Sequence, residues 1–188
     1  TGGTGVVGRA VVELLVAEGH DVSALVRGSP DRPDGVRPVT GDLRDTASLD
    51  RLTAGAEVVF GVGGINELCS RHPGEMWQVN VAGTRNLLES ARRAGVRRVV
   101  HTSSAVTIGE AQGAVGTEET VHSGRHLSHY ARTKTEAERL ALRFEDVEVV
   151  CVNPSSVQGP GRDTGTGRIL LAAAQGRLRY AVDTVFSL

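Results

Sequence analysis

The glycine-rich stretch TGGTGVVGRAVVELL, residues 1–15, decides the fold that this sequence predicts. It contains Gly3-x-Gly5-x-x-Gly8 and the overlapping Gly2-x-x-Gly5-x-x-Gly8, followed by an amphipathic run. Glycines allow a tight turn and a close approach of backbone to a pyrophosphate, and the free N–H groups that begin a helix favour anions. Because the chain holds 24 glycines, the motif alone also fits a glycine-rich loop that enters a helix. As a dinucleotide turn it would contact the cofactor through Gly2, Gly3, Thr4, Gly5, Val6 and Val7.

Short β-branched runs alternate with longer amphipathic runs along the rest of the chain. We expect strands at 21–27, 36–40, 56–62, 96–103 and 147–152, and helices at 6–18, 46–54, 75–94, 128–144 and 165–175. The strands are apolar on both faces, as parallel strands covered by helices must be. The alternation therefore predicts an α/β domain with a doubly wound parallel sheet of the Rossmann type.

Both ends of the sequence look cut. The chain opens on Thr1 inside the glycine turn and closes on the apolar run YAVDTVFSL, 180–188. With 188 residues it is long enough for one sizeable core. We expect a single partial dinucleotide-binding domain over 1–188, with its first strand and most of a C-terminal substrate lobe missing, the lobe beginning at about residue 160.

Composition excludes several classes of partner. The net charge is -1, so nothing in the charge indicates nucleic acid or an anionic membrane as a partner. No apolar run approaches the ~20 residues of a membrane span. Cys69 and Cys151 lack metal-ligand spacing, and Cys151 lies in an apolar run that favours a buried, reduced thiol and a cytoplasmic protein. His122, His126 and His129 have helix-like spacing, but no carboxylate or cysteine completes a metal site, so we expect no metal.

The end of the second expected strand bears on cofactor choice. A dinucleotide fold that binds NAD usually places Asp or Glu there to hold the ribose 2′-hydroxyl. Here, in the run ALVRGS (24–29), the expected strand ends on Arg27 and has no acid at its tip. A guanidinium suits a 2′-phosphate, so NADP(H) is favoured, although a solvated arginine and NAD(H) binding remain open.

The only lysine of the chain, Lys134, follows Tyr130 by four residues in YARTK. Residues at i and i+4 share one face of a helix. A nearby ammonium favours a phenolate and would lower the phenol pKa from its usual ~10. The alternative is a surface pair without function, since Y-x-x-x-K also occurs by chance.

A hydroxyl cluster ends the strand expected at 96–103. The run VVHTSSAV places Thr102, Ser103 and Ser104 at the carboxyl edge, where ligands lie in doubly wound sheets. A hydroxyl there can hydrogen-bond a carbonyl oxygen that gains charge during reaction. Such clusters also form ordinary turns.

Taken in order, these motifs resemble the extended short-chain dehydrogenase/reductases, the NAD-dependent epimerase/dehydratase family. TGGTGVVG resembles its T-G-x-x-G-x-x-G turn, and VNVAGTRNLLESARRAGVRRVVHTSSA (79–105) its central helix and serine strand. YARTK matches its Y-x-x-x-K, and NPSSVQGPG (153–161) resembles its R-P-x-x-V-x-G-P loop. Within the family the sequence is most similar to dihydroflavonol-4-reductase-like proteins and hopanoid-associated sugar epimerases.

The resemblance implies roles for particular residues. Ser104 would bind the carbonyl, Tyr130 would be the general acid/base, and Lys134 would lower its pKa and anchor the ribose. Asp42 and Leu43 of TGDLRD would border the adenine. The remaining implied cofactor contacts are Val62, Gly63, Gly64, Thr102, Asn153, Pro154, Ser155 and Val157.

The sequence departs from the family pattern in two places. GVGG (61–64) replaces the usual H-L-A-A, and in the later loop Asn153 replaces arginine and Gln158 replaces tyrosine. Both changes leave the substrate site harder to assign.

The expected function is an NADP-dependent oxidoreductase that transfers hydride between nicotinamide and a carbonyl or secondary alcohol of a small molecule. Two alternatives stay open: a nucleotide-sugar epimerase or dehydratase with retained NAD(P), and a non-catalytic dinucleotide-binding module. The chain could also form a homodimer.

Overall fold

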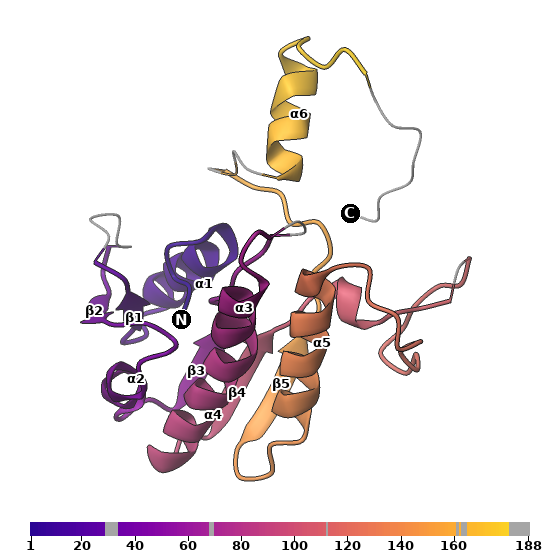
Figure 1. The fold of residues 1–188 in the computed structure, drawn as a ribbon. Helices are drawn as coiled ribbons and strands as arrows, with labels where there is room; N and C mark the ends of the chain where they lie inside the picture. The colour runs from indigo at the N-terminus through magenta and orange to yellow at the C-terminus, as the bar shows by residue number, and fades with distance from the viewer. Residues whose placement is uncertain (29–33, 68–69, 112, 161, 163–164, 181–188) are drawn as a thin grey trace.

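The computed structural model describes residues 1–28, 34–67, 70–111, 113–160, 162 and 165–180, a range that leaves out Cys69. Helices and strands alternate along it as the sequence predicts (Figure 1). The strands are β1 (Ser23–Val26), β2 (Arg37–Thr40), β3 (Val58–Gly61), β4 (Arg98–Thr102) and β5 (Glu148–Val152). The helices are α1 (Val6–Ala17), α2 (Thr46–Thr53), α3 (Pro73–Trp77), α4 (Gly83–Arg93), α5 (His129–Leu142) and α6 (Thr166–Ala174).

Every strand pair within the described residues is parallel. β1 pairs with β2, and β3, β4 and β5 pair in that order. Thr1 lies beside β3: its amine donates to the Phe60 carbonyl at 2.6 Å, and the Val62 N–H donates to the Thr1 carbonyl at 3.3 Å. The glycine turn therefore starts at the carboxyl edge of the sheet, where parallel-sheet proteins bind their ligands.

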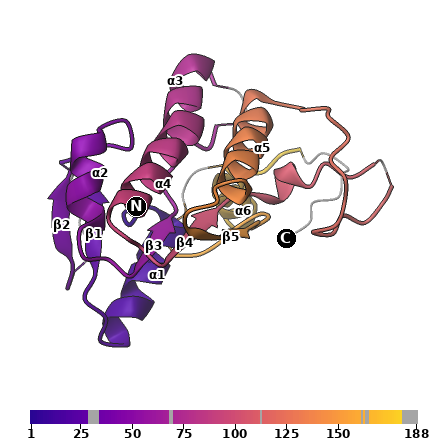
Figure 2. The ribbon, with the colours of Figure 1, turned by 90° about the horizontal axis from the view of Figure 1, so that it is seen from below.

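Helices cover both faces of the strands. Seen from below, α2, α4 and α5 lie on one side of the row of strands and α1 lies on the other (Figure 2). The core between the strands and the α2–α4–α5 layer includes Leu49, Leu88 and Val99, each less than 2% exposed. The prediction of a doubly wound parallel sheet of the Rossmann type is confirmed.

The prediction that all strands are apolar and covered on both faces is wrong for β2, of which only Val39 is partly buried, and for β5. Val150 and Val152 on one face of β5 are 39% and 41% exposed. β5 pairs with one strand only among the described residues and is therefore an edge strand. Cys151 lies on the opposite face of β5 and packs against the core, but it is half-buried and not fully buried. It is a free thiol whose pKa burial raises to about 11.

The helix expected at 75–94 contains a change of winding. α3 runs directly into a π-helical turn, Gln78–Ala82, which continues into α4. Such π-turns inside α-helices are frequent at functional sites. α6 follows the loop after β5 and lies apart from the layers of the sheet (Figure 1). Of the helices that the structure describes, none has the length and apolarity needed to cross a membrane.

Candidate functional site

The glycine turn is held in place by two glycines that the fold requires. Gly2 has a φ of +76°, and a Cβ there would lie 2.5 Å from the Gly63 nitrogen. A Cβ on Gly8 would collide with the carbonyl oxygen of Gly2 and lie 2.6 Å from its carbonyl carbon. Both contacts are to backbone, which cannot swing aside. Gly2 and Gly8 therefore pack the first turn of α1 onto the strand ends.

Gly5 is different, because the fold does not require its lack of a side chain. A Cβ at Gly5 would meet only the Gly2 carbonyl oxygen, at an ordinary 3.5 Å, and Gly5 is exposed. It is the N-cap of α1, its φ of -81° suits any residue, and none of the described side chains caps this helix end. The open space in front of the α1 N-terminus fits the pyrophosphate of a dinucleotide, which needs close backbone approach there.

Three further segments expected at the cofactor site border this turn. A Cβ on Gly63 would lie 3.2 Å from the Thr1 hydroxyl and 3.3 Å from the Leu43 side chain. Leu43 in turn packs against Gly83, where a Cβ would lie 2.9 Å away. The loop after β5 also approaches the turn, since a Cβ on Gly159 would lie 3.6 Å from the Val6 side chain. Val6 and Val7 are half-buried under the turn, and Thr4 is exposed.

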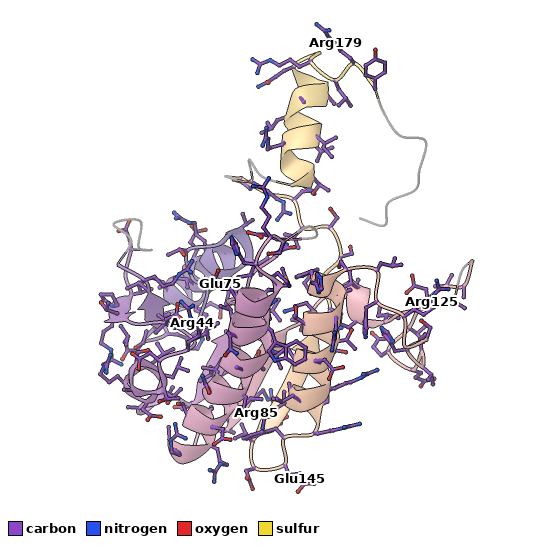
Figure 3. All side chains as sticks on the ribbon, viewed as in Figure 1. Arg44, Glu75, Arg85, Arg125, Glu145 and Arg179 are labelled. Carbon is purple, nitrogen blue, oxygen red and sulfur yellow. The ribbon has the colours of Figure 1, made fainter. Side chains whose placement is uncertain are left out.

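Cationic side chains surround Asp42 at the tip of β2. Arg44 binds its carboxylate through Nε at 2.7 Å and Nη2 at 3.1 Å. The Arg44 hydrogen bond is the main cause that lowers the pKa of Asp42, and Arg27 adds a smaller effect. Arg44 also lies 3.6 Å from Glu75 of α3 (Figure 3). Arg27 is exposed at the end of β1, so its guanidinium is accessible to an anion.

The structure brings Ser104, Tyr130 and Lys134 together. Ser104 follows β4, whereas Tyr130 and Lys134 lie on α5, and all three are less than 10% exposed. The Ser104 side chain lies close enough to Tyr130 to act on the pKa of its phenol. Lys134 donates from Nζ to the Thr102 carbonyl at 2.7 Å, which fixes α5 against the end of β4. The Ser128 hydroxyl caps α5 by accepting from the Ala131 N–H at 3.0 Å and so sets where the helix begins.

The expected effect of Lys134 on the phenol is not what the structure shows. The pKa of Tyr130 is raised above its usual value, because burial disfavours the phenolate more than the Ser104 hydroxyl favours it. The Lys134 ammonium is directed at the backbone of β4, and burial lowers its own pKa to about 8. Desolvation dominates both groups in this packed position.

The loop after β5 packs against the serine segment. The Ser103 N–H donates to the Val152 carbonyl at 2.8 Å, and the Ala105 N–H donates to the Pro154 carbonyl at 3.0 Å. Asn153 donates to the Ser104 carbonyl at 3.3 Å. Ser155, next along the loop, is exposed, and Val157 is half-buried.

Two buried or half-buried polar residues at the site were not singled out from the sequence. Asn80, in the π-helical turn, accepts from the Ile65 N–H at 2.8 Å and donates to the Ile65 carbonyl at 3.0 Å. It also donates to the Thr133 hydroxyl at 3.1 Å, so it ties the loop after β3, which includes Gly64, to α5. Glu138 accepts hydrogen bonds beside Ser104. Asn80 is a polar residue within an otherwise apolar helix pattern, and that signal in the sequence could have indicated that it has a role at the site.

The histidines of the segment before α5 pair with each other. The rings of His122 and His126 have centroids 4.8 Å apart. No group of three His, Cys, Asp or Glu side chains that could hold a metal ion occurs in the part of the chain that the structure describes.

A parallel α/β sheet with a glycine turn opening onto its carboxyl edge defines a dinucleotide-binding domain. Comparison with known proteins agrees: the NAD dependent epimerase/dehydratase family matches residues 1–182, and the chain belongs to this family. Sterol demethylase protein B of Methylococcus capsulatus is 37% identical over 195 aligned positions, which cover 99% of this chain and 60% of that protein. A putative dihydroflavonol 4-reductase of Synechocystis is 35% identical over 199 aligned positions, which cover 100% of this chain and 57% of that protein.

Among solved structures, MoeE5 in complex with UDP-glucuronic acid and NAD has a TM-score of 0.79 and 32% identity, over 92% of this chain and 59% of that one. The chain thus spans roughly three-fifths of the length of these relatives.

Proposed function

We propose that this chain carries the cofactor and proton-transfer site of an NADP(H)-dependent reductase that acts on a carbonyl of a small molecule. The proposal rests on the position of Ser104 near Tyr130 of α5, the helix that also carries Lys134 at the end of β4. Two segments that are far apart in sequence, the end of β4 and α5, supply this set. Membership in the family supports the same reading.

The residues that would hold the cofactor surround the turn. Backbone N–H groups of the α1 N-terminus would bind the pyrophosphate, and Asp42 and Leu43 would border the adenine. When bound, the nicotinamide supplies or accepts the hydride. Lys134, one turn after Tyr130 on α5, would anchor the ribose and hold the β4 end through its bond to Thr102.

Tyr130 would pass the proton. Because burial raises the pKa of Tyr130, the phenol is protonated at neutral pH and is ready to donate. Ser104, which lies near the phenol, would orient the carbonyl oxygen and donate to it as charge develops there. A protonated donor favours reduction near neutral pH, whereas the reverse oxidation requires the phenolate.

The preference for NADP(H) rests on Arg27. Its exposed guanidinium at the tip of β1 can pair with a 2′-phosphate, and no acid stands at that tip. Asp42, on whose pKa Arg27 also acts, is already bound by Arg44.

A second candidate is a nucleotide-sugar epimerase or dehydratase. It is favoured by the likeness to MoeE5, whose structure holds UDP-glucuronic acid and NAD. Such an enzyme retains its cofactor through the cycle, whereas a reductase releases it each turnover. Purification with tightly bound dinucleotide, and no consumption of added NADPH, would favour this second candidate.

The test is a panel of small carbonyl substrates with NADPH and NADH on the complete protein, with two variants. Tyr130→Phe should lower kcat by about 10²–10⁴-fold, because it removes the proton donor. The matched control is Tyr180→Phe, which alters the one other tyrosine, 89% exposed on the segment after α6. If wild-type protein reduces carbonyls and Tyr130→Phe reduces them equally well, the assigned proton donor is wrong.

Cofactor choice is tested separately. Arg27→Ala should raise the Kd for NADPH about 10–100-fold and leave that for NADH nearly unchanged, since one charged hydrogen bond contributes roughly 1.5–3 kcal/mol. Arg85→Ala, which removes another exposed arginine on α4, is the control. An equal loss of NADH and NADPH affinity in Arg27→Ala would show that Arg27 does not read the phosphate.

A further inference from the structure

A hydrogen-bonded cluster lies directly beside Ser104 and has no role in the mechanism above. It consists of Thr107, Glu138 and Asn153, which we call the Ser104 clamp. Glu138 Oε2 accepts from the Thr107 hydroxyl at 2.9 Å and from the Asn153 amide at 2.6 Å. Asn153 Nδ2 also lies 2.8 Å from the Thr107 hydroxyl. The three side chains thus contact one another pairwise.

The clamp joins the three segments that build the site. Thr107 ends the 3-10 turn Ala105–Thr107, immediately after Ser104. Glu138 lies on α5, one turn after Lys134, and Asn153 directly follows β5. The clamp therefore sets the position of the serine segment relative to the helix that carries the phenol.

The clamp grips Ser104 through its backbone. The Ser104 carbonyl accepts from the Thr107 hydroxyl at 2.8 Å and from the Asn153 amide at 3.3 Å. Thr107 has one hydroxyl hydrogen, which it can donate either to Glu138 or to the Ser104 carbonyl, and Asn153 has two amide hydrogens to share among its contacts. The carboxylate oxygen of Glu138 is an acceptor only. Without this acceptor, Asn153 loses its 2.6 Å partner and Thr107 loses one of its two possible acceptors.

Glu138 also acts on Lys134 through its charge. Lys134 is 8% exposed, and burial lowers its pKa to about 8. Glu138 is the first of the groups that oppose this effect, and Cys151 on β5 is the second. His101 on β4 also lies near Lys134, and His101 is neutral because its own pKa falls to about 3. Of these neighbours, Glu138 is the group that carries negative charge.

We propose that Glu138 is a positioning residue for the Ser104, Tyr130 and Lys134 site. Its carboxylate holds the serine segment in place through Thr107 and Asn153. Its charge stabilises the buried ammonium of Lys134. The assignment rests on the proposed function for its catalytic consequence, but its effect on Lys134 does not depend on turnover.

The test compares Glu138→Gln with Glu136→Gln in the complete protein. Glu136 lies on the same helix and pairs with Arg139 at 3.2 Å, so it is a matched carboxylate outside the clamp. Protein labelled with ¹³Cε-lysine is titrated by NMR, and Lys134→Arg identifies the signal of the one lysine in these 188 residues. Glu138→Gln should shift the Lys134 midpoint to lower pH by roughly half a unit or more, whereas Glu136→Gln should leave it unchanged.

Kinetics test the positioning effect. Glu138→Ala, which removes the acceptor oxygen as well as the charge, should lower kcat about 10-fold or more with little change in the KM for NADPH, since small misplacements of reacting groups slow catalysis strongly. Glu136→Ala is its control. Thr107→Val removes one hydroxyl and keeps the charge, so it should lower kcat and leave the Lys134 midpoint at the wild-type value.

Each outcome decides the proposal. Glu138→Gln matching Glu136→Gln in the Lys134 midpoint overturns the charge effect, and Glu138→Ala matching Glu136→Ala in kcat overturns the positioning effect. Thr107→Val with wild-type kcat also overturns the positioning effect, even if the Glu138 variants do not fold. If the wild-type protein reduces no carbonyl, the proposed function fails, while the NMR titration still tests the link between Glu138 and Lys134.

Discussion

Two glycines of the turn should respond in opposite ways to the same substitution. Gly5→Ala and Gly8→Ala each add one methyl group within a single motif, three residues apart. In the structure the added Cβ at Gly5 has an ordinary 3.5 Å neighbour, whereas the Cβ at Gly8 would collide with the Gly2 carbonyl. We expect Gly5→Ala to impair cofactor binding and Gly8→Ala to impair folding.

The expected magnitudes follow from these contacts. Alanine is a poorer N-cap than glycine, so Gly5→Ala should cost less than about 1 kcal/mol of unfolding free energy. Its methyl group fills the space in front of the helix N-terminus, and loss of one charged backbone–phosphate hydrogen bond should weaken dinucleotide binding about 10–100-fold. At Gly8 alanine gains about 1 kcal/mol in helix propensity, but overpacking against backbone costs about 1–3 kcal/mol or more. We therefore expect a net loss of stability at Gly8.

The assay measures both quantities on both variants. Urea unfolding followed by circular dichroism gives the free energy of unfolding, and NADPH fluorescence titration gives Kd for the complete protein. Gly5→Ala should unfold close to the wild-type midpoint and bind NADPH weakly. A Gly5→Ala protein that binds NADPH with wild-type affinity would refute the placement of the pyrophosphate at this turn. A Gly8→Ala protein of unchanged stability would refute the packing argument.

Three further predictions concern the buried groups of the site. Lys134→Arg keeps the positive charge but places a larger planar group where Nζ lies 2.7 Å from the Thr102 carbonyl. The variant should lower both kcat and the affinity for NADPH by about 10-fold or more. Full activity of the variant in a kinetic assay would contradict this prediction. Because burial raises the pKa of Tyr130, the phenolate that alcohol oxidation needs is a minor species near neutral pH. The rate of alcohol oxidation should therefore rise roughly tenfold per pH unit above neutrality, while the rate of carbonyl reduction stays nearly constant. An oxidation rate that is independent of pH would contradict this prediction. The pKa of His101 falls to about 3 on folding, so below about pH 6.5 the unfolded chain binds one proton more than the folded chain, and the free energy of unfolding falls by about 1.4 kcal/mol per pH unit on acidification. His101→Leu should remove this pH dependence, which urea unfolding at two pH values measures. An unchanged difference between the two pH values in the variant would contradict the prediction.

Local patterns in the sequence were sufficient to predict the order of the elements. The alternation of β-branched and amphipathic runs depends on residues two to four positions apart, and the helices and parallel strands lie where that periodicity places them. Which faces of each strand are covered by other elements could not be predicted from these local patterns. Val150 and Val152 look like core residues in sequence, but their exposure depends on whether another element packs on β5. That is a property of distant segments.

The candidate site divides along the same line. The sequence by itself marked the glycine turn, the hydroxyl cluster at 102–104 and the pair of Tyr130 and Lys134, because each is a short-range feature. The choice of Ser104 within its cluster came from the resemblance to the family. Only the tertiary structure distinguished the packing glycine Gly8 from the open Gly5 and gave the direction of the Tyr130 pKa shift.

The contact between Glu138 and Asn153 also became visible only in the structure. These residues lie on a helix and after a strand, and their 2.6 Å hydrogen bond exists because α5 packs against the ends of β4 and β5. Residue identity and spacing fix which groups are available. Burial, which sets desolvation and hydrogen-bond partners, is decided by how the separate elements pack together.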